Sequence, residues 1–160
     1  MSEQPTTTTR IYRRDADSSI LRRPRVFSRT FCGGAELVRT VHFYEAVSGE
    51  RLDQDIDIPD AGLHIIAVGS SLILVLNEEL LGAERYRQAT ATRVTILNAD
   101  LEKTVAMALA DGAHIAAPKF TVPHGSGYRL LHPEGLLVEY LEHRKSAFDV
   151  DKPSSMFDKD

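Results

Sequence analysis

The sequence predicts an α+β fold built from two tandem βαβββ modules. Three observations support this prediction: an ungapped internal repeat, one amphipathic helix in each half, and short β-rich segments separated by turn residues. When the chain is placed against itself at a separation of 64 residues, 36–41 falls on 100–105 and 72–75 falls on 136–139. Self-similarity at a fixed separation indicates a duplicated structural unit.

Each half starts with a strand and continues with a helix. The segments Val26–Cys32 and Val94–Leu97 contain the β-branched or aromatic residues that strands favour. Apolar residues then recur at helical spacing in each half: Leu37, Val41 and Tyr44, and Leu101, Val105 and Ala108. Each predicted helix therefore has one apolar stripe to pack on a sheet, and Asn98 or Asp100 can cap the second.

Three shorter strands complete each predicted module. They are expected near 54–58, 63–68 and 72–76 in the first half, and near 115–117, 128–131 and 136–141 in the second. Turn residues separate them, with Gly69-Ser70 in the first half and His132–Gly135 in the second. The modules then cover about 24–77 and 91–143 of one domain, 24–144. The flanking segments 1–23 and 145–160 have few core-forming residues and are expected to be flexible tails.

Composition excludes several classes of partner. The 160-residue chain has a formal net charge of −4, so it offers no broad basic surface for nucleic acid. Its apolar share of 42% is ordinary for a globular domain, and no apolar run approaches the roughly 20 residues of a membrane helix. The single cysteine, Cys32, cannot form an internal disulfide, and no secretory signal is recognisable. We expect a cytoplasmic protein that acts on a small molecule.

The tandem modules resemble the vicinal oxygen chelate superfamily, which includes glyoxalases, bleomycin-resistance proteins and extradiol dioxygenases. The segment 127–142, with its Pro-Glu-Gly turn, and Phe43-Tyr44 in the first helix carry the resemblance together with the order of elements. The resemblance implies a curved mixed sheet around a cavity. It also implies a homodimer, because the antibiotic-binding relatives that lack metal ligands usually bind between subunits.

Members of this superfamily generally bind a divalent metal through residues on the first and last strands of each module, typically two His and two Glu. The repeat places Arg29 and Arg93 at the two His positions, and Val75 and Glu139 at the two Glu positions. Arginine and valine offer no lone pair to a metal. We therefore expect no metal and no other cofactor.

The residues at these positions predict a different site. Arg29 and Arg93 around Glu139 would leave a net positive charge for the carboxylate, phenolate or enolate of a ligand. Phe27, Phe31, Val75 and Tyr128 are expected to supply further ligand contacts. A purely structural alternative has Glu139 in a salt bridge with Arg29, Arg93 or both. Glu139, His64 and His124 are the candidate acid-base residues.

Three functional readings follow. The first is metal-independent binding of a small oxygenated or aromatic metabolite. The second is a metal-independent lyase, isomerase or cyclase of secondary metabolism, with Glu139 or a histidine as the base. The third is a metal-dependent glyoxalase-like or dioxygenase-like enzyme with displaced ligands, for which His64, His124 and Glu139 are the candidates.

Overall fold

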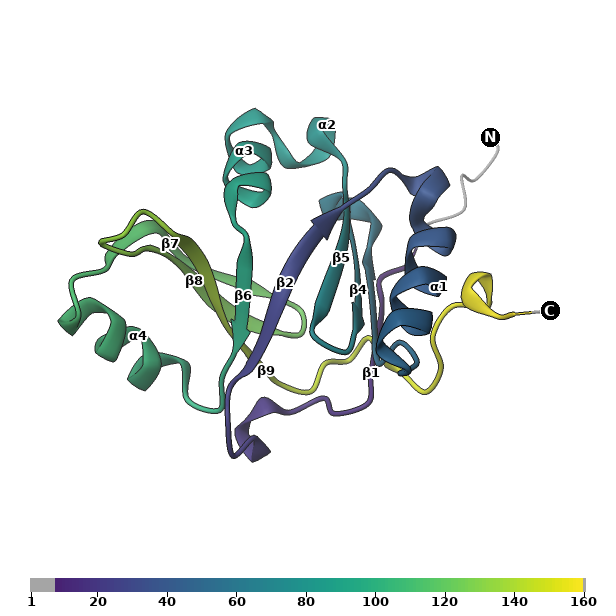
Figure 1. The fold of residues 1–160 in the computed structure, drawn as a ribbon, viewed down its shortest axis with the longest axis horizontal. Coiled ribbons are helices and arrows are strands. Elements are labelled where there is room, and N and C mark those ends of the chain that lie inside the picture. The colour runs from purple at the N-terminus through teal and green to yellow at the C-terminus, as the bar shows by residue number, and fades with distance from the viewer. Residues whose placement is uncertain (1–7, 160) are drawn as a thin grey trace.

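One curved mixed sheet of ten strands forms the body of the protein (Figure 1). The computed structural model describes residues 8–159, and within them the strand order is β10-β1-β3-β4-β5-β2-β6-β9-β8-β7. The two helices that pack on the outside of the sheet, α1 and α4, lie at opposite ends of the molecule (Figure 1). The fold class predicted from the sequence is confirmed.

Both modules have the predicted βαβββ order. The first contains β2 (Arg25–Phe31), α1 (Leu37–Ser48), β3 (Gln54–Ile58), β4 (Leu63–Val68) and β5 (Ser71–Leu76). The second contains β6 (Val94–Leu97), α4 (Leu101–Ala110), β7 (His114–Val122), β8 (Gly125–Leu131) and β9 (Leu137–His143). Strand β7 is much longer than the predicted 115–117, because it pairs with β8 through two register shifts.

The helices begin and end where local chemistry favours it. The Asp100 carboxylate accepts a hydrogen bond from the backbone N–H of Lys103 at 3.1 Å, so the predicted cap of α4 is confirmed. Gly49, at a φ of 71°, ends α1 in the left-handed conformation that favours glycine. The buried faces of the helices include the predicted stripe residues Leu37, Val41, Leu101 and Val105, which belong to two separate cores.

The two modules meet along the middle of the sheet. Strand β2 pairs antiparallel with β6, and each of these strands pairs in parallel with the last strand of its own module, β5 or β9. This register sets Arg29 beside Leu72 and Thr95 beside Glu139. A third core group, which includes Phe27, Leu74 and Leu97, faces the concave side of the sheet.

A helical connection links the modules and lies at the top of the view in Figure 1. It consists of α2 (Glu78–Leu81) and α3 (Ala83–Ala91). Asn77 caps α2 by accepting hydrogen bonds from the backbone N–H groups of Glu79 and Leu80. Leu81 and Ala89 are buried on the sheet side, so this connection covers part of the concave face.

The segments 8–23 and 145–159, which the sequence predicts to be flexible tails, contribute strands and core residues instead. The predicted domain boundaries are therefore wrong in the described part of the chain. Strand β1 (Arg10–Arg13) pairs antiparallel with β3 and in parallel with β10 (Asp149–Val150). Ile11 is fully buried, and Phe157 packs in the core beneath α1. Backbone pairing and one buried apolar residue in each segment hold these polar segments in place. Neither segment has the regular spacing of apolar residues from which a strand or helix is predicted. Residues 1–7 lie outside the described part of the chain.

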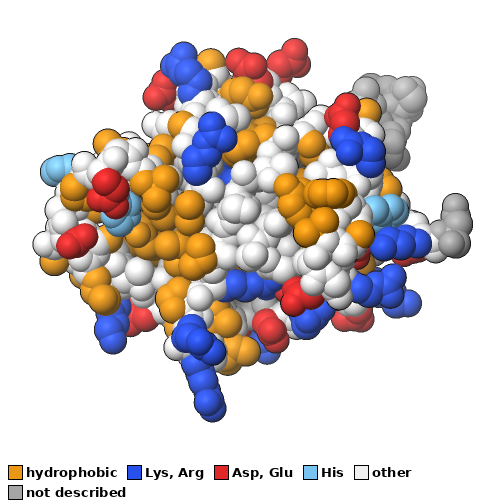
Figure 2. Space-filling model, in the orientation of Figure 1, with side chains coloured by type: hydrophobic (Ala, Val, Ile, Leu, Met, Phe, Trp, Pro, Cys, Tyr) orange, Lys and Arg blue, Asp and Glu red, His pale blue; other side chains and the backbone are white. Residues whose placement is uncertain are grey.

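The surface shows no extended region of one charge on the face in Figure 2. Acidic and basic side chains alternate around its edge, and hydrophobic side chains gather over the half that contains the second module (Figure 2). None of the helices within residues 8–159 is long and apolar enough to cross a membrane.

Candidate functional site

The concave side of the sheet encloses a cavity of about 560 Å³ between the modules. Its walls are mainly apolar, and both modules and the connecting helices contribute to them. The apolar lining includes Phe27, Leu72, Leu74, Leu81, Leu97, Phe120 and Leu141. A cavity of this size, with few polar groups, is typical of a small-molecule site.

A buried ionic network forms one polar region of this cavity. The Oε1 atom of Glu139 accepts hydrogen bonds from Nη1 of Arg29 at 3.1 Å and from Oγ1 of Thr95 at 3.3 Å. Its Oε2 atom accepts a hydrogen bond from Nη2 of Arg129 at 3.2 Å. All four side chains line the cavity. Two guanidinium groups and one carboxylate leave a net positive charge there.

Burial and the two neighbouring charges all act on the pKa of Arg29. Burial lowers the pKa of Arg29, the Glu139 carboxylate opposes this effect, and the Arg129 charge adds to it. The Arg29 side chain is only 2% exposed, and its Nη2 atom also donates to the carbonyl of Ala89 on α3 at 2.9 Å. The Nε atoms of Arg29 and Arg129 are buried without a protein partner among the described residues. The network therefore retains hydrogen-bonding capacity.

Four of the predicted site residues line the cavity: Phe27, Arg29, His124 and Glu139. The predicted salt bridge between Glu139 and Arg29 is present. Phe31 lies beside the Arg29 guanidinium, with its ring centre 5.6 Å away, and packs with the apolar residues of the concave face. It supports Arg29 but is not among the lining residues.

The placement of Arg93 in the site is wrong. Arg93 is exposed just before β6, and Thr95 occupies the position next to Glu139. The residues that correspond in the two parallel strand pairs are 66 positions apart for Arg29 and Thr95, and 67 for Leu72 and Glu139, rather than 64. The modules differ in loop and helix length, so an ungapped repeat cannot preserve the register of every strand.

Val75 and Tyr128 are also misplaced by the sequence interpretation. Val75 lies three residues after Leu72, which corresponds to Glu139, and Tyr128 directly precedes Arg129. Because side chains alternate between the two faces of a strand, both residues lie on the face opposite the cavity. Val75 packs against the core beneath α1, and Tyr128 packs against the core beneath α4. The Tyr128 hydroxyl donates to the carboxylate of Glu102, outside the cavity.

His64 does not face the cavity either. Its Nε2 atom lies 2.8 Å from Oδ1 of Asp55, and its ring packs near that of Phe157. The displaced ligand set of His64, His124 and Glu139 is therefore not assembled. Within residues 8–159, no group of three His, Cys, Asp or Glu side chains is arranged to hold a metal ion.

Arg129 and His143 are cavity residues that the sequence interpretation missed. The hairpin register could have revealed Arg129, because the turn at 132–135 pairs Leu131 with Leu137 and hence Arg129 with Glu139. Strand β9 continues to His143, two residues beyond the predicted end, and alternation from Glu139 places His143 on the cavity face. A predicted strand that ended two residues later would have included His143 among the site residues.

His124 and His143 form a second polar region of the cavity. Their rings lie 5.1 Å apart in an edge-to-face arrangement, and the two residues are 5% and 4% exposed. Burial and then the Arg13 charge lower the pKa of His124 to about 4. Burial and then His124 lower the pKa of His143 well below its ordinary value. Both imidazoles are therefore neutral at pH 7.

Both ends of the chain help to build this end of the cavity. The Arg13 side chain is fully buried; its Nη1 atom donates to the carbonyl of His124 at 3.2 Å, and Nη2 donates to that of Arg144 at 3.1 Å. Arg13 also forms an ion pair with Asp149 of β10. Strand β1, the β7–β8 turn and the residues after β9 are therefore held together by one side chain.

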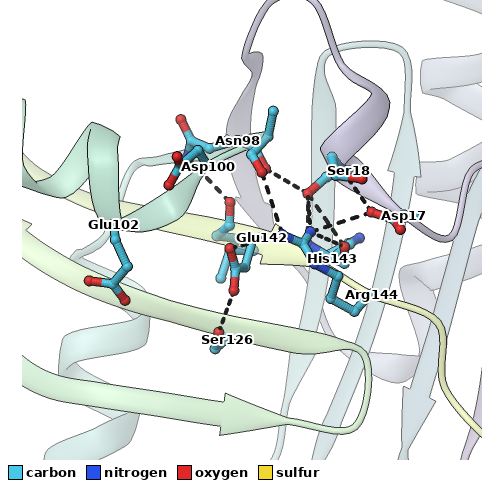
Figure 3. Close-up of polar contacts among 12 residues, drawn as sticks. Asp17, Ser18, Asn98, Asp100, Glu102, Ser126, Glu142, His143 and Arg144 are labelled. Atoms are coloured by element: carbon cyan, nitrogen blue, oxygen red, sulfur yellow. Dashed lines mark hydrogen bonds and ion pairs between the residues drawn. The ribbon is translucent and has the colours of Figure 1, made fainter.

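Ser18 fixes the backbone of His143 (Figure 3). Its Oγ atom donates to the carbonyl of Asn98 at 2.6 Å and accepts from the backbone N–H of His143 at 2.9 Å. Arg144 lies beside this cluster and forms ion pairs with Asp17 and Glu142. The N-terminal segment is thus tied to the ends of β6 and β9.

Replacing Ser18 by alanine is expected to lower the free energy of unfolding by about 1–2 kcal/mol, because buried backbone groups lose their partner. Urea denaturation of Ser18→Ala measures the loss. Ser19→Ala removes a neighbouring exposed hydroxyl and is the control, with little expected change. Equal effects of the two substitutions would contradict the assigned role of Ser18.

Comparison with known proteins identifies the fold. No protein-family model and no curated protein matches the chain. An uncharacterised protein from Methanosarcina mazei is 26% identical, with a TM-score of 0.60, over 76% of this chain and 93% of that one. Methylmalonyl-CoA epimerase from Mycobacterium tuberculosis is 12% identical, with a TM-score of 0.50, over 74% of this chain and 87% of that one. The second likeness shows the fold alone. The chain therefore shares the fold of these proteins, and the predicted glyoxalase/bleomycin-resistance-like fold is confirmed.

Proposed function

We propose that the cavity binds a small oxygenated or aromatic organic acid without a metal, and that Arg29 and Arg129 receive its anionic group. The observation that carries this proposal is the buried network in which two arginines share the carboxylate of Glu139. Buried guanidinium groups favour carboxylate, phenolate and enolate oxygens. The apolar walls supply the burial that a small organic ligand requires.

The residues on the first and last strands of the modules do not fit a divalent metal. The cavity side of these strands presents Arg29, Leu72, Thr95 and Glu139 beside one another. Only Glu139 is an anionic donor, and the guanidinium of Arg29 repels a cation and has no lone pair. This donor set supports the metal-independent part of the proposal.

The contacts of Glu139 favour binding over acid-base catalysis at this residue. Both carboxylate oxygens accept hydrogen bonds, from Arg29 and Thr95 on one side and from Arg129 on the other. A carboxylate held in this way orients the two guanidinium groups, and an incoming anion can add to their remaining donors. Recovery of an added ligand in unchanged form supports binding. Turnover that Glu139→Gln abolishes would instead support the lyase, isomerase or cyclase reading.

Decanoic acid is expected to bind at least about tenfold more tightly than decanol, because only the acid gains charge-assisted hydrogen bonds. Isothermal titration calorimetry with the two compounds measures this preference. Arg129→Leu is expected to reduce it to within about twofold.

Arg93→Leu is the matched control, because Arg93 carries the same charge but is exposed outside the cavity. It should leave the preference for the acid unchanged. Equal binding of acid and alcohol by the unsubstituted protein would overturn the proposal. So would a loss of preference in Arg93→Leu that matches the loss in Arg129→Leu.

A further inference from the structure

We infer that the cavity binds an elongated ligand with two polar ends, an acidic group at the arginines and a neutral hydroxyl group at His124 and His143. The ligand class is thus a mainly apolar acid with an alcohol or phenol at its far end. This inference rests on the proposed function for its acidic end. Its hydroxyl end rests on a separate set of residues.

The two imidazoles have hydrogen-bonding capacity that the protein does not use. The Nδ1 atoms of His124 and His143 are buried and have no hydrogen-bond partner among the described residues. Both side chains line the same cavity as the arginine network. A buried polar atom without a partner is costly, so a ligand that supplies the missing partner gains affinity.

A hydroxyl group matches this pair better than a charged group does. A neutral imidazole has one N–H donor and one acceptor nitrogen, and a hydroxyl can donate or accept whichever nitrogen carries the proton. The nearby Arg13 charge disfavours a cationic ligand group at the pair. Arg13 is itself ion-paired with Asp149 and directed at backbone carbonyls, so its charge is already balanced by the protein.

The geometry of β9 sets the separation of the two ends. Glu139, Leu141 and His143 alternate along the strand on its cavity side. Four residues of extended strand span about 13 Å. Leu141 lies between the polar ends and, with Leu97 and Phe27, provides an apolar middle section. A chain such as that of decanoic acid has a comparable extended length.

The hydroxyl site is held in place by the surrounding backbone contacts. Ser18 fixes the backbone of His143, and Arg13 fixes the carbonyl of His124 (Figure 3 shows the Ser18 contacts). The edge-to-face contact then fixes the two rings relative to each other. A site whose residues are held by buried contacts is preorganised for its ligand.

Calorimetry with decanoic acid and ω-hydroxydecanoic acid tests the inference. The hydroxy acid is expected to bind about fivefold more tightly to the unsubstituted protein. His124→Leu and His143→Leu should each reduce this preference to within about twofold. His114→Leu, at an exposed position in β7, is the control and should retain it.

The two proposals fail in distinguishable ways. A comparison of decanediol with decanol measures the contribution of the far hydroxyl with no acid present and needs no variant. If the diol and the hydroxy acid show no advantage, the hydroxyl site is overturned, while a preference for decanoic acid over decanol still supports the arginine site. If the diol binds better than decanol but the acids show no preference, the proposed function fails, and so does the two-ended ligand. Survival of the hydroxyl preference in both His124→Leu and His143→Leu would overturn their assignment.

Discussion

Replacing Glu139 by leucine is expected to lower the free energy of unfolding by about 3–5 kcal/mol. The carboxylate is the shared partner of two inward-facing guanidinium groups, and Arg29 is almost completely buried. Leucine leaves both charges without a counter-ion in the apolar cavity. Urea denaturation at neutral pH measures the change.

The matched control is Glu102→Leu, which breaks an exposed ion pair with Lys119 on the outside of the second module. Exposed pairs contribute little, so this substitution should change stability far less. The double variant Arg29→Met with Glu139→Leu should recover part of the loss, because it removes the buried charge together with its partner. A Glu139→Leu protein as stable as Glu102→Leu would contradict the network described here.

Acidification is expected to destabilise the protein between about pH 7.5 and pH 4.5. The pKa of His124 is about 4 in the folded protein against an ordinary 6.5, so the unfolded chain binds its proton first. The stability that neutral His124 contributes is fully present above the ordinary pKa of 6.5 and is lost as the pH falls towards its folded-state pKa. We expect a loss of about 2–3 kcal/mol from His124 alone between about pH 7.5 and pH 4.5. His143, whose pKa is also lowered, adds to this loss.

Urea denaturation at a series of pH values measures this effect. Asp17, Glu84 and Glu102 also have lowered pKa values, but their contributions are lost only below their ordinary values of 3.8 to 4.5. His124→Leu removes one of the two buried imidazoles. It should make the free energy of unfolding depend less steeply on pH above about pH 4.5. An unchanged slope in this variant would show that His124 is not the group responsible.

The local sequence was sufficient to predict the module plan. Strands 54–58 and 63–68 occur as expected, because turn residues bound both segments. The helices occur where the apolar stripes place them, and the Asp100 cap was recognisable from its chemistry. Periodicity and turns are local properties, which is why they could be read from the chain directly.

The site was only partly predictable, because it depends on register between distant strands. Arg29 and Glu139 were identified, since each lies on a strand with clear alternation. The ungapped repeat ignores the different lengths of the two modules, so it placed Arg93 where Thr95 lies. The second arginine of the network, Arg129, comes from the hairpin register of β8 and β9, which the repeat does not give. Residues of β1 and β10 showed no apolar periodicity, since backbone pairing, the single buried Ile11 and the polar contacts of Arg13 order them.

The pairing of β1 with β10 also constrains how the protein can be made. Strand β1 is translated before the rest of the sheet, and its parallel neighbour, Asp149–Val150, is translated more than a hundred residues later. Contacts between such distant segments form slowly, because a long loop must close before they contribute any stability. The end of the cavity that contains His124 and His143 is therefore complete only after β10 has been synthesised, whereas the residues of the arginine network all lie between Arg29 and Glu139.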